Sequence, residues 1–271
     1  MGGKYPAAEV QLLEDLLHQA PRNFGWLTSR WTLRTLQQTC GWLKAYSLSG
    51  VWRVLRANNL HYKRGQQQLH SPDPDYAAKR DYIRWCVRQA HQHPNRVVVL
   101  FLDEFSYYRW PGVAQVYSSV GRRQPKAKLT ASYNTQGRLV TALEVSHGKV
   151  LYLLRSHITL HVLVLFLQQV RQAFPKAERI YIVQDNWHNV HFHPDQVAAA
   201  KTLKITLVPL PTYAPWLNPC EKLGRKLRQD VTHMHDLAQD WDGLKKAVTG
   251  FLDQFSSGSI DLLKYSGLLP D

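Results

Sequence analysis

Apolar residues recur at helical spacing along the first sixty positions of the chain. They predict a first helix that ends at Pro21, a second that begins after Thr32 as its N-cap, and a third over residues 47–58. The third helix is expected to be amphipathic, with inward positions at Leu48, Val51, Trp52 and Leu55. Two short helices joined by a tight turn form a helix-turn-helix, so the sequence predicts a small all-α module.

The outward face of the third predicted helix is basic, and a basic segment follows it. We expect contacts with DNA from this helix and from residues 61–64, a wing or strand. The candidate DNA-binding residues are Ser49, Arg53, Arg56, Lys63 and Arg64. The alternative is a small helical subdomain with incidental arginines. We assign residues 1–70 to this module and residues 71–94 to a linker and connecting helix, because prolines interrupt a polar stretch there.

Strand and helix patterns alternate from residue 95 onward. Three continuous apolar runs, over 96–105, 179–183 and 204–210, predict buried strands of the kind found in parallel sheets. Antiparallel strands are expected over 113–120, 127–134, 137–146 and 149–154. Helices are predicted over 157–173, over 194–201, from 219 onward and over 241–255. The fold class is therefore α/β, with a mixed sheet flanked by helices over residues 95–271.

Carboxylates follow the buried strands of this second part. Asp103 and Glu104 end the first run, Asp185 ends the second, and Glu221 lies in the helix after the third. Because parallel strands place their carboxyl ends at one edge of a sheet, we expect Asp103, Asp185 and Glu221 to converge there. Clustered carboxylates repel one another unless a cation neutralises them, and Mg²⁺ prefers such oxygen ligands.

Each of these carboxylates also has a purely structural explanation. Asp103 and Glu104 fit strand-end residues that face solvent, and Asp185 suits a turn. Glu221 completes a capping box that begins at Asn218. Three carboxylates in strand, strand and helix contexts, beside a DNA-binding module, nevertheless favour a site for metal-dependent phosphodiester cleavage.

The charge distribution separates the two parts of the chain. The net charge is +14, yet no carboxylate lies between Asp15 and Asp73, a stretch of 57 residues that holds eight Lys and Arg. A solvated surface mixes both signs, whereas nucleic-acid-binding modules gain affinity by releasing counterions from phosphates. Two further basic clusters, one with Arg122 and Arg123 and one with Arg225, are candidate DNA contacts. The alternative for both is a solvated face.

Composition excludes several classes of protein. Apolar residues make up 44% and charged residues 20% of the 271 residues, which is a globular composition. No apolar run reaches the roughly 18 residues of a membrane span, and no signal peptide is evident, so we expect a cytoplasmic, nucleoid-associated protein with no membrane partner. Three distant cysteines exclude a disulfide framework. For His191 we prefer a place near the active site or on the DNA path over a zinc site with His188 and His193.

Three motifs carry a family resemblance. They are Phe101-Leu102-Asp103-Glu104, Val183-Gln184-Asp185-Asn186, and the stretch LPTYAPWLNPCE from Leu210 to Glu221. They closely resemble DDE transposases of the mariner superfamily, in its bacterial insertion-sequence branch. Thirty-five residues separate Asp185 from Glu221, which is similar to the spacing in that family. The resemblance implies a ribonuclease H-like catalytic domain whose Asp103, Asp185 and Glu221 form the catalytic, metal-binding triad.

The resemblance also sets the functional expectation. It implies binding of double-stranded DNA at terminal inverted repeats, cleavage at the element ends with water, and joining of the 3′-hydroxyl to target DNA, commonly at TA. Mg²⁺ or Mn²⁺ is the implied cofactor, expected as two ions. Because transposition joins two ends, we expect a homodimer on DNA.

Two features depart from the family pattern. Only one helix-turn-helix unit is evident in a short chain, and Gly224 stands where family members carry a large aromatic residue. These features keep a second hypothesis open, a non-catalytic DNA-binding protein that is either a regulator or an inactive transposase remnant. A structure-specific nuclease with the same fold is a third.

Overall fold

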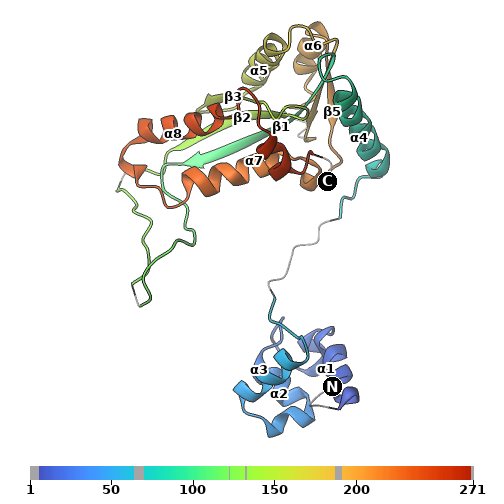
Figure 1. Cartoon of the computed structure of the whole chain (residues 1–271), viewed down its shortest axis with the longest axis vertical. Helices are drawn as coiled ribbons and strands as arrows, with labels where there is room; N and C mark the ends of the chain where they lie inside the picture. Colours follow the sequence, from blue (N-terminus) through green and yellow to red (C-terminus); the bar gives the residue numbers. More distant parts are fainter. Residues whose placement is uncertain (1–5, 64–69, 122, 132, 187–190, 270–271) are drawn as a thin grey trace. The chain divides into compact units, whose positions relative to one another are not determined.

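The structure divides the chain into two units. The computed structural model describes residues 6–63, 70–121, 123–131, 133–186 and 191–269. Its contacts separate Met1–Gln68 from Leu69–Asp271 (Figure 1). Within the described ranges, no helix is both long enough and apolar enough to cross a bilayer.

The N-terminal unit is a helical module with its own core. Its elements are α1 (Ala7–Leu17), η1 (Pro21–Phe24), α2 (Leu33–Thr39), η2 (Gly41–Ala45) and α3 (Leu48–Ala57), where η1 and η2 are short 3₁₀ segments. Thr32 caps α2 by accepting a hydrogen bond from the Thr35 N–H, and Ser47 caps α3 in the same way from the Gly50 N–H. Buried apolar residues of all three α-helices meet in one cluster. The helix–turn–helix arrangement predicted from the sequence is present as α2, η2 and α3.

The inward face of α3 differs from the predicted one. Val51 and Val54 are fully buried, whereas Leu48 and Trp52 are 37% and 52% exposed. The prediction is wrong for Leu48 and Trp52, because a helix of 10 residues over a small core buries only a narrow stripe. Trp52 instead stands on the outer face, where the Arg56 guanidinium lies 5.6 Å from its ring centroid.

The larger unit contains one mixed sheet. Its elements are α4 (Tyr76–Gln92), β1 (Val97–Tyr108), β2 (Gln136–Glu144), β3 (Val150–Arg155), α5 (Leu160–Ala173), β4 (Arg179–Gln184), α6 (Pro194–Thr202), β5 (Ile205–Pro209), η3 (Pro215–Leu217), α7 (Cys220–Leu227), the π-helical turn η4 (Arg228–Thr232), η5 (Leu237–Gln239), α8 (Trp241–Asp253) and α9 (Ile260–Ser266). The strand order is β3-β2-β1-β4-β5. β1 pairs antiparallel with β2 and parallel with β4, so the most apolar run of the sequence lies at the centre of the sheet.

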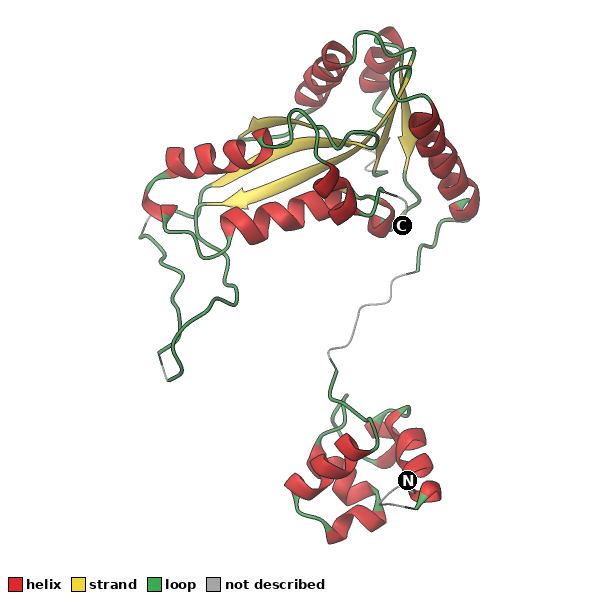
Figure 2. Cartoon of the chain, viewed as in Figure 1, coloured by secondary structure: helices red, strands yellow, loops and turns green. Residues whose placement is uncertain are grey.

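Helices cover both faces of this sheet (Figure 2). One core cluster joins the sheet to α5 and α6, and the other joins it to α4, α7, α8 and α9. Successive residues of β1 alternate between the two clusters, since Phe101 and Phe105 belong to one and Leu100 and Leu102 to the other. The predicted fold class, a mixed α/β sheet flanked by helices with an all-α N-terminal unit, is confirmed.

Two strand predictions in this unit are wrong. The described residues of 113–120 and 127–134 form no strand but belong to a long loop between β1 and β2 (Figure 1). The apolar side chains that suggested strands, Val113, Val116, Tyr117, Val120, Leu129 and Tyr133, are exposed. β-branched and aromatic residues favour a strand only where a neighbouring strand and a core cover them, and neither is present along this loop.

The first strand is also longer than predicted. β1 continues to Tyr108, so Asp103 and Glu104 lie within the strand rather than at its end. Its last residues, from Phe105 to Tyr108, still pair with β2. The pairing of β1 with β4 ends earlier, at Phe101. The two carboxylates therefore stand where the parallel partner ends, and this is the edge at which Asp185 follows β4.

Candidate active site

Asp103 occupies the centre of the candidate site. Alternation along β1 places its side chain on the same face as Phe101 and Phe105, the face covered by α7. Its Oδ1 accepts a hydrogen bond of 2.9 Å from the Glu104 N–H. Its Oδ2 is buried and has no hydrogen-bond partner among the residues that the structure describes. A buried carboxylate oxygen without a partner is costly, and a bound cation would remove that cost.

Asn218 fixes the position of Glu221 relative to Asp103. The buried Asn218 side chain donates to the Leu102 carbonyl at 3.1 Å and accepts from the Cys220 N–H at 3.1 Å. It thereby ties the first residue of α7 to the strand residue next to Asp103. The alternative explanation of Glu221 by a reciprocal capping box does not hold, because the Asn218 N–H donates to the Pro215 carbonyl and not to the Glu221 side chain. Helix capping therefore does not account for Glu221.

Gly224 allows α7 to approach the sheet closely. A Cβ at this position would lie 2.5 Å from a ring carbon of Phe105, closer than two carbon atoms can pack. Phe105 is buried and comes from β1, two residues after Asp103. The space that an aromatic residue at 224 would take is thus filled by an aromatic side chain of the strand, and this departure from the family pattern has a packing explanation.

The surroundings of Asp103 are strongly negative. Burial, followed by the charges of Glu221, Glu104 and Asp185, raises the pKa of Asp103 to about 8, although the Glu104 N–H opposes the shift. Glu221, Glu104 and Asp185 thus act electrostatically on Asp103. Among the described residues, however, the ligand atoms that lie within 4.8 Å of one another belong to Glu104, Asp185 and His191, not to the predicted triad. A divalent ion bound among these carboxylates would reverse the shift.

His191 joins two of these carboxylates. Its Nε2 lies 2.8 Å from Glu104 Oε1, and its Nδ1 is hydrogen-bonded to Asp185 Oδ1. Burial disfavours the charged ring, but the hydrogen bonds and charges of Asp185 and Glu104 prevail and raise the pKa of His191 to about 10. The ring is thus a cation at neutral pH that donates to both carboxylates. A ligand atom of each of these three residues lies within 4.8 Å of the others.

A buried glutamine pair holds the segment that carries His191. Gln196 Oε1 accepts a hydrogen bond of 2.8 Å from the Phe192 N–H, and Phe192 has a positive φ of 62°. The Gln196 amide also faces that of Gln184 at the end of β4. The predicted place for His191 near the active site agrees with this geometry, whereas His188 of the weaker zinc hypothesis lies outside the described residues.

Glu104 has a larger role than the structural one that the sequence predicts. It shares the buried His191 with Asp185. The signal that could have found this role is strand alternation: two consecutive carboxylates on a buried strand must face opposite sides. One faces α7 and Glu221, and the other faces the side on which α6 and His191 lie.

The DNA-binding candidates are distributed over both units. Ser49, Arg53, Arg56 and Lys63 are exposed in the N-terminal unit, and Arg123 and Arg225 are exposed in the larger one. Arg64 and Arg122 lie outside the described residues. The described part of the predicted wing, residues 61–63, is extended but forms no strand. The structure thus leaves the side chains of six candidates accessible to a polyanion.

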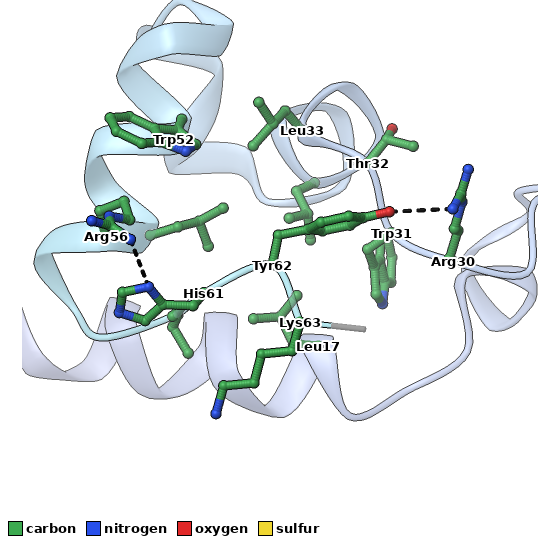
Figure 3. A pocket seen from close by; sticks show the side chains of 13 residues that line it. Leu17, Arg30, Trp31, Thr32, Leu33, Trp52, Arg56, His61, Tyr62 and Lys63 are labelled. Carbon is green, nitrogen blue, oxygen red and sulfur yellow. Dashed lines mark hydrogen bonds between the residues drawn. The ribbon is translucent and has the colours of Figure 1, made fainter. Parts of the chain in front are cut away.

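A cavity of about 620 Å³ lies beneath residues 61–63 in the N-terminal unit (Figure 3). Leu33, Leu36 and Leu55 form part of its apolar wall. Two hydrogen bonds fasten the segment above it, one from Arg56 to His61 Nδ1 at 2.8 Å and one from Arg30 to the Tyr62 hydroxyl at 3.2 Å. The bond from Arg56 ties this segment to α3.

Comparisons with known proteins agree with this description. A family model described as DDE superfamily endonuclease matches residues 81–245. The insertion element IS630 uncharacterized 39 kDa protein of Shigella sonnei is 25% identical over 248 residues, which cover 90% of this chain and 70% of that protein. The Mos1 transposase paired-end complex with the left transposon end has a TM-score of 0.62 at 17% identity, over 99% of this chain and 77% of that one. The Mos1 mariner paired-end complex with Mn has a TM-score of 0.64 at 17% identity, over 99% and 76%.

Proposed function

The chain belongs to the DDE superfamily endonucleases, the family that its motifs indicated, and we propose that it is a DNA transposase of the IS630 and mariner branch. In this proposal it binds the terminal inverted repeats of its element, hydrolyses phosphodiester bonds at the ends, and joins the freed 3′-hydroxyl to target DNA. The observation that carries the proposal is Asp103, a buried carboxylate with an unpartnered oxygen amid the charges of Glu221, Glu104 and Asp185.

The residues fit a divalent cation. Asp103, Asp185 and Glu221 supply only oxygen donors, which Mg²⁺ and Mn²⁺ prefer, and the buried Oδ2 of Asp103 has no hydrogen-bond partner among the described residues. We assign these three as the catalytic, metal-holding residues, with two ions as the expected number. When bound, such ions activate the attacking oxygen and stabilise the leaving one in phosphodiester cleavage. Complexes of the related Mos1 protein with Mn and with Mg support this assignment.

The protein's own side chains position the site. Thr141 on β2 donates through its hydroxyl to the Asp103 carbonyl at 3.1 Å, and Asn218 ties α7 to Leu102, so Asp103 and Glu221 stand on a fixed frame. His191 restrains Asp185 and compensates part of the negative charge. No residue is assigned as a separate general base in this proposal, because bound cations would lower the pKa of the attacking water.

The N-terminal unit is the proposed DNA-binding module, over residues 1–70. Its exposed α3 carries Arg53 and Arg56, and no carboxylate lies between Asp15 and Asp73 to oppose a phosphate backbone. Residues 71–94 connect it to the catalytic domain, residues 95–271. The connecting helix α4 also contributes buried side chains to the core beneath the sheet. Structural similarity to a Mos1 transposase complex that holds a left transposon end supports the choice of element ends as the ligand.

A homodimer is the proposed working form. The described residues of the loop between β1 and β2 expose six large apolar side chains, among them Tyr117 and Tyr133. Exposed apolar surface of this kind is typical of a contact with another protein. Two protomers holding one end each would explain why a DNA-joining enzyme carries such a loop. Gel filtration of the protein on end DNA should give two protomers per complex, and a single protomer would contradict this part of the proposal.

Nicking of a plasmid that carries the element's own ends tests the proposed function. Asp185→Asn should lose Mg²⁺-dependent nicking by about a hundredfold or more while retaining DNA binding in a gel shift, because the variant removes a cation ligand and leaves α3 unchanged. Asp261→Asn, an exposed carboxylate on α9, is the matched control and should nick normally.

The outcomes separate the three hypotheses. Equal nicking by Asp185→Asn and the unaltered protein would reject the triad. Binding to the ends without nicking in any divalent cation would favour the non-catalytic DNA-binding protein. Nicking that is just as strong on a plasmid without inverted repeats would favour the structure-specific nuclease.

A further inference from the structure

Two exposed aromatic side chains stand on a rigid loop beside the candidate active site. The loop joins β5 to α7, and Tyr213 is 71% exposed and Trp216 48% exposed. Three residues of the same loop, Leu210, Ala214 and Asn218, are buried and fix it to the domain. Large aromatic rings that remain in solvent on a well-anchored segment have no role in burying the core, so they are available to a ligand.

The position of Tyr213 is set from the start of α4. The buried Asp73 carboxylate accepts a hydrogen bond of 2.8 Å from the Thr212 N–H and one of 2.7 Å from Lys79 Nζ. The Ser71 hydroxyl donates to the Thr212 carbonyl. Both polar groups of the Thr212 backbone are thus held, and Tyr213 next to it has a positive φ of 53°. A left-handed conformation at a bulky residue persists only where the surroundings enforce it, which makes the outward direction of this ring a built feature.

Trp216 is held from the same side. Its indole N–H donates to the Tyr76 hydroxyl at 3.1 Å, and the two rings are 6.5 Å apart. The Arg80 guanidinium lies 5.9 Å from the Tyr76 ring centroid and is paired with the Asp81 carboxylate at 2.9 Å. The exposed rings of Tyr213 and Trp216, supported by Tyr76, form what we call the aromatic platform.

The platform adjoins the cleavage chemistry. Asn218, two residues after Trp216, bonds to the Leu102 carbonyl next to Asp103, and Glu221 follows three residues later. An exposed aromatic ring suits one kind of group in a DNA substrate, the face of an unstacked base, because stacking on aromatic side chains accepts any base. A paired base inside a duplex does not expose that face, so the surface selects unpaired nucleotides.

We propose that the aromatic platform, Tyr213 and Trp216, stacks an unpaired nucleobase of the DNA next to the phosphodiester bond to be cut or joined. The platform keeps the strand end from returning to the duplex and so holds it near Asp103 and Glu221. This inference rests on the proposed function, since it assigns a DNA group to a surface of the same site. It specifies a ligand, an unpaired base, that the carboxylates themselves do not recognise.

A base-stacking measurement without catalysis tests the platform. The full-length protein is titrated, in EDTA, into a duplex with a short single-stranded extension that contains 2-aminopurine, whose fluorescence falls when it stacks. The unaltered protein should quench the fluorescence and should prefer the extended duplex over a blunt duplex of the same sequence. Tyr213→Ala and Trp216→Ala should each lower that preference by about tenfold, while Tyr213→Phe, which keeps the ring, should retain it.

Controls keep this test independent of folding and of cleavage. Tyr82→Ala removes a comparable exposed ring, 44% exposed on α4, and should leave quenching unchanged. Circular dichroism and the unchanged affinity for blunt duplex show that each variant is folded. Equal quenching by Tyr213→Ala, Trp216→Ala and the unaltered protein would overturn the platform. Because no divalent cation is present, that result would leave the nicking prediction for Asp185→Asn standing. Equal nicking by Asp185→Asn and the unaltered protein would reject the triad but leave the stacking result standing.

Discussion

At the scale of single residues, Asp103 shows how a site can oppose stability. Its burial and the neighbouring charges of Glu221, Glu104 and Asp185 raise its pKa to about 8, so the ionised carboxylate is disfavoured in the folded protein. The unfolded chain has an ordinary carboxyl pKa, and folding therefore becomes less favourable as pH rises from the unfolded pKa toward 8. Asp103→Asn should raise the free energy of unfolding by about 1–3 kcal/mol at pH 7.5 in EDTA, measured by urea denaturation.

Magnesium should reverse the order of stability of Asp103→Asn and the unaltered protein. A cation that binds only the folded state stabilises it by mass action, so Mg²⁺ should raise the melting temperature of the unaltered protein and leave Asp103→Asn unchanged. Asp261→Asn, whose carboxylate is exposed, should respond to Mg²⁺ as the unaltered protein does. An Asp103→Asn protein that is less stable than the unaltered one in EDTA would show that this carboxylate is well compensated without a cation.

At the scale of elements, the contact between α7 and β1 is the one on which the site depends. Gly224 lets the Phe105 ring pack on the helix backbone, and a methyl group there would lie 2.5 Å from the ring. Gly224→Ala should therefore destabilise the protein by about 1–3 kcal/mol in urea denaturation, despite the better helix propensity of alanine. Gly250 on α8 is the matched control, because a Cβ there meets nothing within 4 Å, and Gly250→Ala should stabilise by about 0.5–1 kcal/mol. Equal effects of the two substitutions would show that α7 can shift away from the sheet.

Local pattern also explains which elements could be predicted. β4 and β5 could be predicted because strands buried on both faces are continuous apolar runs. α8 could be predicted because a helix buried along one stripe has apolar residues at helical spacing. The loop between β1 and β2 could not be predicted, since Val113 and Tyr117 favour a strand locally and only the absence of a strand partner decides against it. Strand alternation predicts only that Glu104 faces away from Asp103. The hydrogen bonds from His191 to Glu104 and Asp185 could not be predicted, because they join side chains from three segments of the chain.

At the scale of the whole molecule, charge is divided unevenly between the two units. The stretch from Asp15 to Asp73 has eight Lys and Arg and no carboxylate between its ends, whereas the larger unit carries the carboxylates of the candidate site. A unit that binds phosphates through such cations releases one counterion for each contact, so affinity for duplex DNA should fall steeply as salt rises. In the proposed function, the N-terminal unit holds DNA while the clustered carboxylates of the larger unit hold cations.

The salt dependence of duplex binding tests this division in the full-length protein. In a plot of log affinity against log salt, Arg53→Ala and Arg56→Ala should each reduce the slope by about 1 if the residue contacts a phosphate. Arg96→Ala, in the larger unit, is the control: its guanidinium is paired with Glu178 at 2.6 Å, and its loss should leave the slope unchanged. A substitution that weakens binding equally at every salt concentration would instead assign that arginine to a base edge. If neither arginine alters affinity or slope, α3 is not the recognition helix, and binding must come from the basic clusters around Arg123 and Arg225.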